Sequence, residues 1–441
     1  MALSAAGLSA VLLTAGKTDA RYVAHEWGTF TSVQGADGAL LDWKPLESSL
    51  LPKFVYNWAN PGLNRRPTSA LIPGKGRLLA RQRMETPVIY FYSDRKQTVD
   101  VSVHFPQGLI TEWYPQAARI GPSTVAASPW VAKFDDYAHR AGISPGFSFL
   151  SLGRNAGTKD SQANWSRVEI LPSGEETGLA GSLPMDRSGS HYFAARDTKA
   201  SLLRLQSIVS TNPLPEYEKF LFYRGVGNFS TPLRVTMESN ETVTLSNEGQ
   251  EPIAHLFVLA VQNHAGSYVF VPGLHPEERR RVNLSQEHYS VESLSHRLGA
   301  KLAASLEREG LYPEEASAMV NTWKDSWLEE EGVRVLYVLP RAWTDRTLPL
   351  ALDPAPHELN RVMVGRAEIL TTALEQRLAG ELTKAEQGDA VASDNARAEL
   401  WKLGRFAEPA LRLALEGSSL AVNQTAWALF QSAAKPSVTQ N

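Results

Sequence analysis

The sequence predicts an α+β fold: a mainly antiparallel, β-sandwich-like N-terminal region, then a mixed α/β segment, then a helical C-terminal end. Up to residue 285, short runs of β-branched and aromatic residues are separated by Gly and Pro turns, and helical periodicity is almost absent. Beyond that residue, apolar side chains recur at helical spacing. We therefore expect a sandwich-like domain with long loop insertions over 21–285, a mixed α/β region packed on it over 286–388, and a helical unit over 389–441.

The composition is that of a soluble globular protein. Of the 441 residues, 43% are hydrophobic and 21% are charged, and the chain is longer than one typical domain. The formal net charge is −3, so nothing indicates a nucleic-acid partner. No stretch beyond the first twenty residues has the length and apolarity of a transmembrane helix, so we expect no integral membrane segment.

The chain contains no cysteine, which excludes disulfides, zinc–thiolate sites and a thiol nucleophile. Residues 5–15 form a short apolar run of small residues that is too short to span a bilayer. We interpret residues 1–20 as the remnant of an export signal, although no basic residue precedes Lys17 and an ordinary N-terminal helix is the alternative. The sequence thus predicts an extracytoplasmic protein, either periplasmic or secreted.

The first strand is predicted over 22–33, which is rich in aromatic and β-branched residues. Because side chains alternate along a strand, the stretch has two faces. One face carries His25, Trp27 and Thr29, and the other carries Glu26, Gly28 and Phe30.

The stretch 83–115 predicts three strands and two turns, and the second hairpin has a preferred register. If residues 106–108 form a three-residue loop, Phe105 pairs with Leu109 and Val101 faces Trp113, which keeps one face apolar. A two-residue closure would mix polar with apolar side chains. The preferred register gathers these residues on one polar face: Asp100, Ser102, His104, Glu112 and Tyr114, with Ile110 among them.

This polar face has two interpretations. It is either the solvated outer face of an antiparallel sheet or the floor of a ligand cleft. In the second case Glu112 is the candidate catalytic carboxylate, with Asp100 or Glu26 as its partner. The candidate binding residues are His25, Trp27, His104 and Tyr114.

Further strands follow before residue 285. They are expected over 164–171, 191–197, 201–211, 219–223, 232–247 and 253–262, the last forming a hairpin with 266–271. Beyond residue 285, Ser290 caps a helix that ends at Gly310, and Pro313 opens a second helix that ends at Gly332. Strands are expected over 333–339, 348–352 and 361–370, before a helix that starts with a capping box from Thr372 to Glu375.

Two local motifs resemble catalytic signatures without meeting their requirements. Gly142-Ile-Ser-Pro-Gly146 matches the G-x-S-x-G pattern, but Pro145 has no backbone N–H for an oxyanion hole. His25-Glu26 resembles the start of the H-E-x-x-H zinc motif, but Thr29 stands where the second histidine would be. The sequence therefore does not predict an enzyme class.

A metal site remains a further alternative. His255 and His264 flank an apolar strand and its turn, and together with His25 and His104 they could form a histidine site. No Walker A or G-x-G-x-x-G context is present, so no cofactor is predicted.

The C-terminal stretch 396–433 resembles a HEAT-type α-hairpin. The sequence runs Ala398-Glu-Leu-Trp-Lys-Leu-Gly-Arg-Phe-Ala-Glu-Pro409-Ala-Leu-Arg-Leu-Ala-Leu415, with Gly404 ending one helix, Pro409 starting the next and leucines on the inner face. HEAT units stack to bury a continuous face and commonly bind partners. The resemblance implies a partner-binding or domain-packing role for this end.

Most of the remaining chain is similar to an uncharacterised family of exported bacterial proteins. The similarity is carried by His25-Glu-Trp-Gly-Thr-Phe-Thr, Arg83-Met-Glu-Thr-Pro-Val-Ile-Tyr-Phe-Tyr and Trp343-Thr-Asp-Arg-Thr-Leu-Pro-Leu350. The resemblance implies an extracytoplasmic location and gives no activity to expect.

Three functions follow from the sequence. The first is an extracytoplasmic binding protein for a glycan or an envelope protein. The second is a carboxylate-dependent glycan hydrolase or lyase that uses the Glu112 face, since sugar sites combine carboxylates with aromatic platforms. The third is a histidine-based metal-binding protein.

Overall fold

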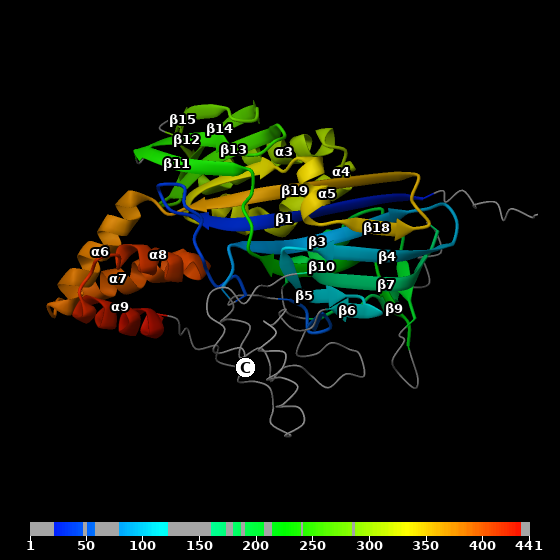
Figure 1. The fold of residues 1–441 in the computed structure, drawn as a ribbon, viewed down its shortest axis with the longest axis horizontal. Helices are drawn as coiled ribbons and strands as arrows, with labels where there is room; N and C mark the ends of the chain where they lie inside the picture. Colours follow the sequence, from blue (N-terminus) through cyan, green and yellow to red (C-terminus); the bar gives the residue numbers. More distant parts are fainter. Residues whose placement is uncertain are drawn as a thin grey trace, which may run out of the picture.

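The computed structural model describes residues 22–46, 51–57, 79–121, 160–172, 180–186, 190–206, 214–239, 241–284 and 287–433. The expected export signal over 1–20 and the Gly142–Gly146 motif lie outside these ranges. Within them the fold is α+β, with β-sheets dominating the N-terminal part and helices the C-terminal part (Figure 1).

A ten-stranded, mainly antiparallel sheet forms the centre of the molecule. Its strands run in the order β16-β14-β13-β17-β19-β1-β3-β10-β5-β2, and β1 and β19 form a parallel pair. The strands are β1 (Val23–Gln34), β2 (Tyr56–Asn57), β3 (Gln82–Tyr92), β5 (Gly108–Tyr114), β10 (Phe220–Gly227), β13 (Ile253–Gln262), β14 (Ala265–Leu274), β16 (Tyr289–Ser290), β17 (Gly332–Val338) and β19 (Glu358–Ile369).

This sheet runs across the expected boundary at residue 285. The strands β17 and β19 come from the mixed α/β segment and lie between β13 and β1 of the N-terminal region. The two segments therefore share one sheet, and both contribute to the cores on its two faces. The sequence pattern reveals each strand but not its neighbour, because strand pairing is set by contacts between residues far apart in the chain.

Two smaller antiparallel sheets accompany the large one. One contains β18 (Leu350–Asp353), β4 (Gln97–Phe105), β7 (Ser161–Ile170), β8 (Leu203–Leu205) and β9 (Glu216–Glu218), with β6 (Arg119–Gly121) beside β7. The other contains β11 (Leu233–Ser239), β12 (Thr242–Asn247) and β15 (Arg279–Asn283). Their apolar side chains share a core with one face of the large sheet.

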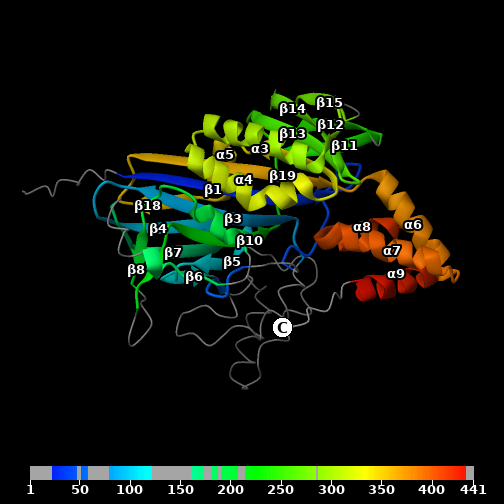
Figure 2. The ribbon, with the colours of Figure 1, turned by 180° about the vertical axis from the view of Figure 1, so that it is seen from behind.

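The alternation along β1 explains the layers. Phe30 belongs to the core shared with the smaller sheets, whereas Trp27 belongs to the core between the large sheet and the helices. The second core is covered by α3 (Val291–Arg308) and α4 (Pro313–Lys324), which lie over β1 and β19 in Figure 2. The predicted two-faced first strand is confirmed. With both faces covered, its side chains from Ala24 onward are buried, charged ones included.

The helices expected after residue 285 are present, but the second, predicted to end at Gly332, ends as an α-helix at Lys324. Ser290 caps α3 by accepting a hydrogen bond from the backbone N–H of Ser293, and Gly310 has a φ of 101°, which favours glycine after a helix. A short π-helix, η6 (Asp325–Glu329), joins α4 to β17, and α5 (Arg341–Thr347) precedes β18. No helix in the described ranges combines the length and the apolarity that crossing a bilayer requires.

Four further helices form the C-terminal end, which Figure 1 shows beside one end of the large sheet. They are α6 (Thr372–Glu386), α7 (Ala390–Leu403), α8 (Ala407–Ala414) and α9 (Leu420–Ala433), with the 3₁₀ turn η7 (Gly404–Phe406) between α7 and α8. They have a core of their own. A smaller cluster attaches them to the sheet, where the rings of Trp43 and Phe406 lie 5.5 Å apart.

Three local expectations differ from the structure. The stretch expected as one strand over 232–247 forms the two antiparallel strands β11 and β12. The helix α6 is capped by Thr371, whose hydroxyl accepts from the N–H of Leu374, one residue before the predicted cap. The stretch predicted as a strand over 191–197 is a 3₁₀ helix, η5 (His191–Arg196). The Ser190 hydroxyl caps η5, and Tyr192 and Ala195 are buried three positions apart, a spacing that suits a 3₁₀ helix.

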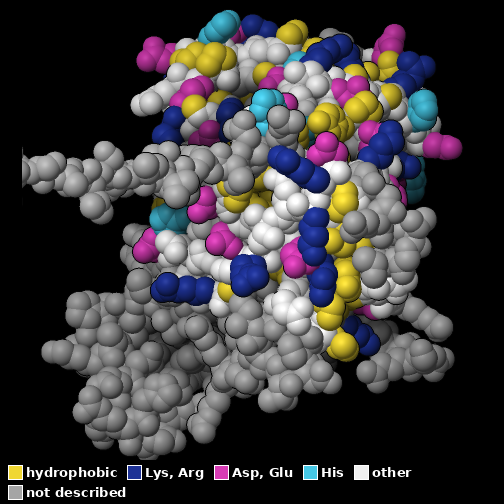
Figure 3. Space-filling view, turned by 90° about the vertical axis from the view of Figure 1, so that its right-hand side faces the viewer, with side chains coloured by type: hydrophobic (Ala, Val, Ile, Leu, Met, Phe, Trp, Pro, Cys, Tyr) yellow, Lys and Arg dark blue, Asp and Glu magenta, His cyan; other side chains and the backbone are white. Residues whose placement is uncertain are grey.

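Basic and acidic side chains are intermixed on the face of the molecule in Figure 3, beside a narrow strip of hydrophobic side chains. This mixture is what the formal net charge of −3 leads one to expect. It offers no support for a nucleic-acid partner on that face.

Two glycines provide a test of the packing. Gly365 of β19 pairs with Tyr337 of β17, and a Cβ there would lie 2.2 Å from Cζ of the tyrosine ring. We expect Gly365→Ala to lower the free energy of unfolding by about 1–3 kcal/mol, because the buried ring has to move. Gly380 in α6 has open space around it, so Gly380→Ala should stabilise by about 1 kcal/mol through helix propensity. Urea unfolding of both variants checks the opposite signs.

Candidate functional site

The second hairpin predicted within 83–115, with its loop at 106–108, does not form. The strand β4 pairs with β18 and β7, whereas β5 pairs with β10 and β2 in the other sheet. Only two residues separate β4 from β5, so the three-residue loop and the register that places Val101 opposite Trp113 are both wrong. Val101 pairs with Trp165 of β7 instead. The proposed polar face, with Asp100, His104 and Glu112 together, therefore does not exist.

Glu112 is a structural ion-pair partner inside the large sheet. Its side chain is almost fully buried, and its carboxylate accepts hydrogen bonds from Nε of Arg224 at 3.1 Å and from the hydroxyl of Thr111. Arg224 is its cross-strand neighbour on β10. A carboxylate held in this way is not positioned to meet a substrate.

Glu26 is similarly enclosed. Its side chain is fully buried between the sheets, and its carboxylate accepts from Nε of Arg361 at 2.5 Å and from the hydroxyl of Tyr223. Arg361 also donates to Asp345 at 2.7 Å. Burial and the charge of Glu26 raise the pKa of Tyr223 well above its usual range, so its hydroxyl remains a donor.

The three candidate catalytic carboxylates are not brought together. Glu26 on β1 and Glu112 on β5 are three strand spacings apart, roughly 14 Å. That exceeds the separation of carboxylate pairs in glycosidases, about 5–10 Å. Asp100 lies on β4 in the other sheet, where its exposed carboxylate accepts from the backbone N–H of Arg167 at 2.6 Å.

The candidate binding residues on β1 are also internal. His25 is fully buried, and its Nδ1 lies 2.7 Å from Oε2 of Glu315 at the start of α4. The same carboxylate accepts from the hydroxyl of Tyr92 at 2.7 Å. His25 therefore fastens β1 to α4, and Trp27 is part of the core under the helices.

The two remaining candidates lie apart from each other. His104 is partly exposed, and its Nε2 lies 2.6 Å from Oδ1 of Asp160. Tyr114 is 4% exposed, and its ring lies against those of Phe54 and Tyr56 at 4.8 and 6.1 Å. The hydroxyl of Tyr56 donates to Glu216, whose pKa is raised by burial.

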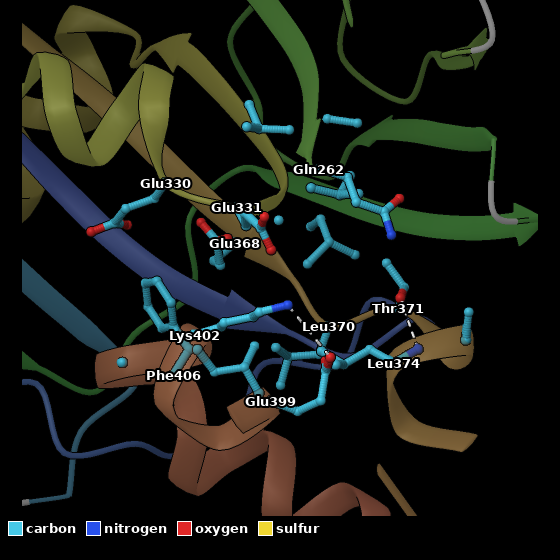
Figure 4. A pocket seen from close by; sticks show the side chains of 18 of the residues that line it. Gln262, Glu330, Glu331, Glu368, Leu370, Thr371, Leu374, Glu399, Lys402 and Phe406 are labelled. Carbon is cyan, nitrogen blue, oxygen red and sulfur yellow. Dashed lines mark hydrogen bonds and ion pairs between the residues drawn. The ribbon is translucent and has the colours of Figure 1, made fainter. Parts of the chain in front are cut away.

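A cleft of about 430 Å³ lies where the large sheet meets the helical end (Figure 4). One wall comes from β13, β17 and β19, and the other from α6, α7 and η7. Its lining includes the apolar residues Val261, Val333, Ile369, Leu370, Leu374, Leu403 and Phe406. The cleft therefore combines apolar surface with charged groups on both walls.

Charged side chains from both walls reach toward the cleft space in Figure 4. Lys402 of α7 is 47% exposed, and its Nζ lies 3.9 Å from Oε1 of Glu399, which also accepts from Arg377 at 2.8 Å. From the sheet side, Oε1 of Glu331 accepts from the backbone N–H of Asn263 at 3.1 Å. The exposed charges of Lys402 and Glu331 can change partners when a ligand enters.

Along the sheet wall lies a network of opposite charges that is buried except at Glu330, whose side chain is 46% exposed. Glu368 accepts from Arg334 at 3.0 Å and from Arg366 at 2.8 Å, and Arg366 also donates to Glu330 at 2.8 Å. Arg334 and Arg366 are almost completely buried. Although burial alone would raise it, the pKa of Glu330 is lowered by Arg366, Arg405 and Arg334. These three guanidiniums favour the charged form of Glu330.

Sequence reasoning missed these cleft residues. The available signal was local: Arg334 interrupts one predicted apolar strand, and Arg366 and Glu368 stand two apart in another, on one face. Charges inside a strand that is otherwise apolar indicate buried pairs. The sequence does not reveal which strand supplies the partner.

Within the described residues, no group of three His, Asp or Glu side chains has an arrangement that could hold a metal ion. His25, His104 and His255 each pair with a different carboxylate: Glu315, Asp160 and Glu309.

Comparison with known proteins gives little further information. No protein-family model and no curated protein matches the chain. Among solved structures, the yeast delta-COP-I mu-homology domain complexed with a Dsl1 WxWxV peptide is similar with a TM-score of 0.25 and 5% identity, over 79% of this chain and 98% of that one. A second structure, of the yeast delta-COP-I mu-homology domain, gives a TM-score of 0.25 and 6% identity over the same shares. Likenesses this weak establish neither fold nor function.

Proposed function

We propose that the protein is an extracytoplasmic binding protein that holds a segment of a partner protein, such as another envelope protein, in the cleft between the large sheet and the helical end. The observation that carries the proposal is the cleft itself, which has apolar surface and exchangeable charges on facing walls. The extracytoplasmic location rests on the short apolar run at the N-terminus and on the absence of cysteine.

The lining of the cleft favours a protein segment over a glycan. Glycan sites present aromatic faces to the sugar, but Phe406, the aromatic residue of this lining, is only 5% exposed. Charged groups such as Lys402 and Glu331 instead suit the mixed side chains of a peptide. The resemblance of the helical end to a HEAT unit points the same way.

Glycan binding has one observation in its favour elsewhere. The rings of Phe54, Tyr56 and Tyr114 are grouped beside the carboxylate of Glu216, and the first two keep some exposed surface. Aromatic faces beside a hydrogen-bonding carboxylate suit a sugar. A glycan array with wild type and Tyr56→Ala separates this second candidate from the first, because Tyr56 is outside the cleft.

A charge reversal on the α7 wall tests the cleft. Peptides that bind the protein would be selected from a displayed random-peptide library, and their affinities measured by calorimetry. We expect Lys402→Glu to weaken binding by at least tenfold, because it places a second carboxylate beside Glu399. Lys384→Glu is the matched control: it makes the same charge change on an exposed position of α6 that does not line the cleft. The control should change affinity by less than twofold.

Two results would contradict the proposal. One is a library of high diversity that yields no binder. The other is a set of binders whose affinity for Lys402→Glu equals that for wild type, since such peptides would occupy another surface.

A further inference from the structure

The buried network beside the cleft contains guanidinium nitrogens that the rest of the network does not satisfy. No residue that the structure describes accepts a hydrogen bond from Nη1 of Arg366, or from Nε and Nη2 of Arg405. The other nitrogens of the two side chains have acceptors. Arg366 donates to Glu330 and Glu368, and Arg405 donates to Glu85. Buried donors without acceptors are rare and destabilising, particularly on a charged group.

Both side chains contact one aromatic residue of the cleft lining. The ring of Phe406, which lines the cleft, lies 5.3 Å from Cζ of Arg366 and 4.9 Å from Cζ of Arg405. Arg405 is itself a lining residue, and 12% of its side chain is exposed. Arg366 is 99% buried, but both carboxylates it binds, Glu330 and Glu368, line the cleft. The unsatisfied donors therefore belong to one residue of the cleft lining, Arg405, and to one side chain, Arg366, that contacts the lining.

The chemistry of these donors selects a class of ligand group. A guanidinium stays charged and donates in a fixed plane, which fits the paired oxygens of a carboxylate or a phosphate. The nearby carboxylates do not fill this role in the structure, where Glu85, Glu330 and Glu368 accept from other nitrogens of the same two arginines. An acceptor has to come from outside the network.

We propose that the part of the cleft beside Phe406 is an oxyanion site, in which a carboxylate or phosphate group of the ligand accepts hydrogen bonds from Arg366 and Arg405. The inference rests on the proposed function and makes it more specific: the bound segment carries an acidic side chain, a C-terminal carboxylate or a phosphorylated residue. The exposed charges near the mouth, on Lys402 and Glu331, then contact the flanking residues of the segment.

Free ions test the site without a peptide. Acetate and inorganic phosphate would be titrated separately at constant ionic strength, made up with chloride, while the arginine Nε–H resonances are followed by NMR. We expect at least one of these ions to shift two such resonances saturably. The ion that binds more tightly, acetate or phosphate, identifies whether the natural group is a carboxylate or a phosphate. Arg405→Lys keeps the charge beside Glu85 but removes the unsatisfied Nε and Nη2 donors, so it should weaken binding by at least tenfold. Arg377→Lys, on the cleft wall, is the matched control and should change affinity by less than twofold.

The outcomes are separable from those of the peptide experiment. The absence of saturable shifts, or equal affinity in Arg405→Lys and wild type, overturns the oxyanion site even if peptides bind in the cleft. Ion binding that Arg405→Lys weakens supports the site even if no peptide is found, and only the proposed function is then lost.

Discussion

Replacing Arg361 by methionine is expected to lower the free energy of unfolding by about 3–5 kcal/mol. The substitution leaves the carboxylate of Glu26 fully buried without its cationic partner, which now lies 2.5 Å away. It also removes the donor that satisfies the backbone carbonyl of Leu348 at 2.6 Å. Urea unfolding at pH 7, with far-UV circular dichroism as the signal, measures the loss.

Two companion variants test whether the loss of stability arises from the unpaired buried charge of Glu26. Arg346→Met breaks an ion pair with Glu251 in which the arginine side chain is 54% exposed, so it should cost less than about 1 kcal/mol. The double variant Glu26→Met/Arg361→Met replaces both buried charges by apolar groups and should recover most of the loss. If Arg361→Met alone proved as mild as Arg346→Met, Glu26 would not be held as a buried charge.

This experiment also bears on function. Glu26 is a candidate catalytic carboxylate on sequence grounds because it lies in an aromatic-rich strand. Its burial against Arg361 and Tyr223 assigns it to the core, where its carboxylate links β1 to the neighbouring β19 and, across β3, to β10. A substitution that unpairs Glu26 lowers the amount of folded protein, and this loss lowers the signal in a binding assay as well. Comparison with Arg346→Met separates the loss of a buried ion pair from the loss of an exposed one.

The sequence predicts the strands and helices better than it predicts which strands pair with each other. Most described strands and helices can be predicted, because alternation and helical spacing are properties of residues close together in the sequence. The hairpin between β4 and β5 is wrong, because two strands two residues apart in sequence can enter different sheets. Gly108 illustrates the point: the ring of Phe105, the last residue of β4, occupies the space beside it, and a Cβ on Gly108 would lie 2.1 Å from that ring. Gly108 is therefore required because the ring of Phe105 packs against it at the point where β4 and β5 enter different sheets. In the sequence, such a glycine cannot be distinguished from one that is required by a hairpin turn.

The cleft was beyond sequence reasoning for a related reason. Its walls come from strands near residues 260, 333 and 369 and from helices near residues 374 and 402, and no local pattern shows that these meet. The charges behind it were visible as arginines and glutamates within apolar strands. Which of them pair, and which donors remain unsatisfied, depends on the packing of the helical end against the sheet.

The second large effect is a dependence of stability on pH that originates at Glu85. This carboxylate is 2% exposed and accepts from Arg405 at 3.0 and 3.2 Å and from the hydroxyl of Thr31 at 2.6 Å. Burial alone would raise its pKa, but Arg405 and Arg83 together lower it from 4.5 to about 2. The folded state therefore binds this proton more weakly than the unfolded chain does.

The sign of the effect follows from linkage. Because the folded pKa is the lower one, the stabilising contribution is complete above pH 4.5 and is lost as the pH falls toward about 2. The difference between 4.5 and about 2, at 1.36 kcal/mol for each pH unit, corresponds to about 3 kcal/mol. Urea unfolding between pH 7 and pH 2.5 should show a loss in wild type that is smaller by about this amount in Glu85→Gln.

A matched control and a local signal make the assignment specific. Glu248→Gln removes an exposed carboxylate, 57% accessible, so its pH profile should run parallel to that of wild type. Because Glu85 of β3 binds Arg405 of η7, acid should also loosen the attachment of the helical end near Trp43, which packs against Phe406. Trp43 is one of eleven tryptophans, so its emission has to be isolated by comparison with Trp43→Phe. If Glu85→Gln and wild type lose stability equally in acid, the ion pair between the sheet and the helical end is not the group that titrates.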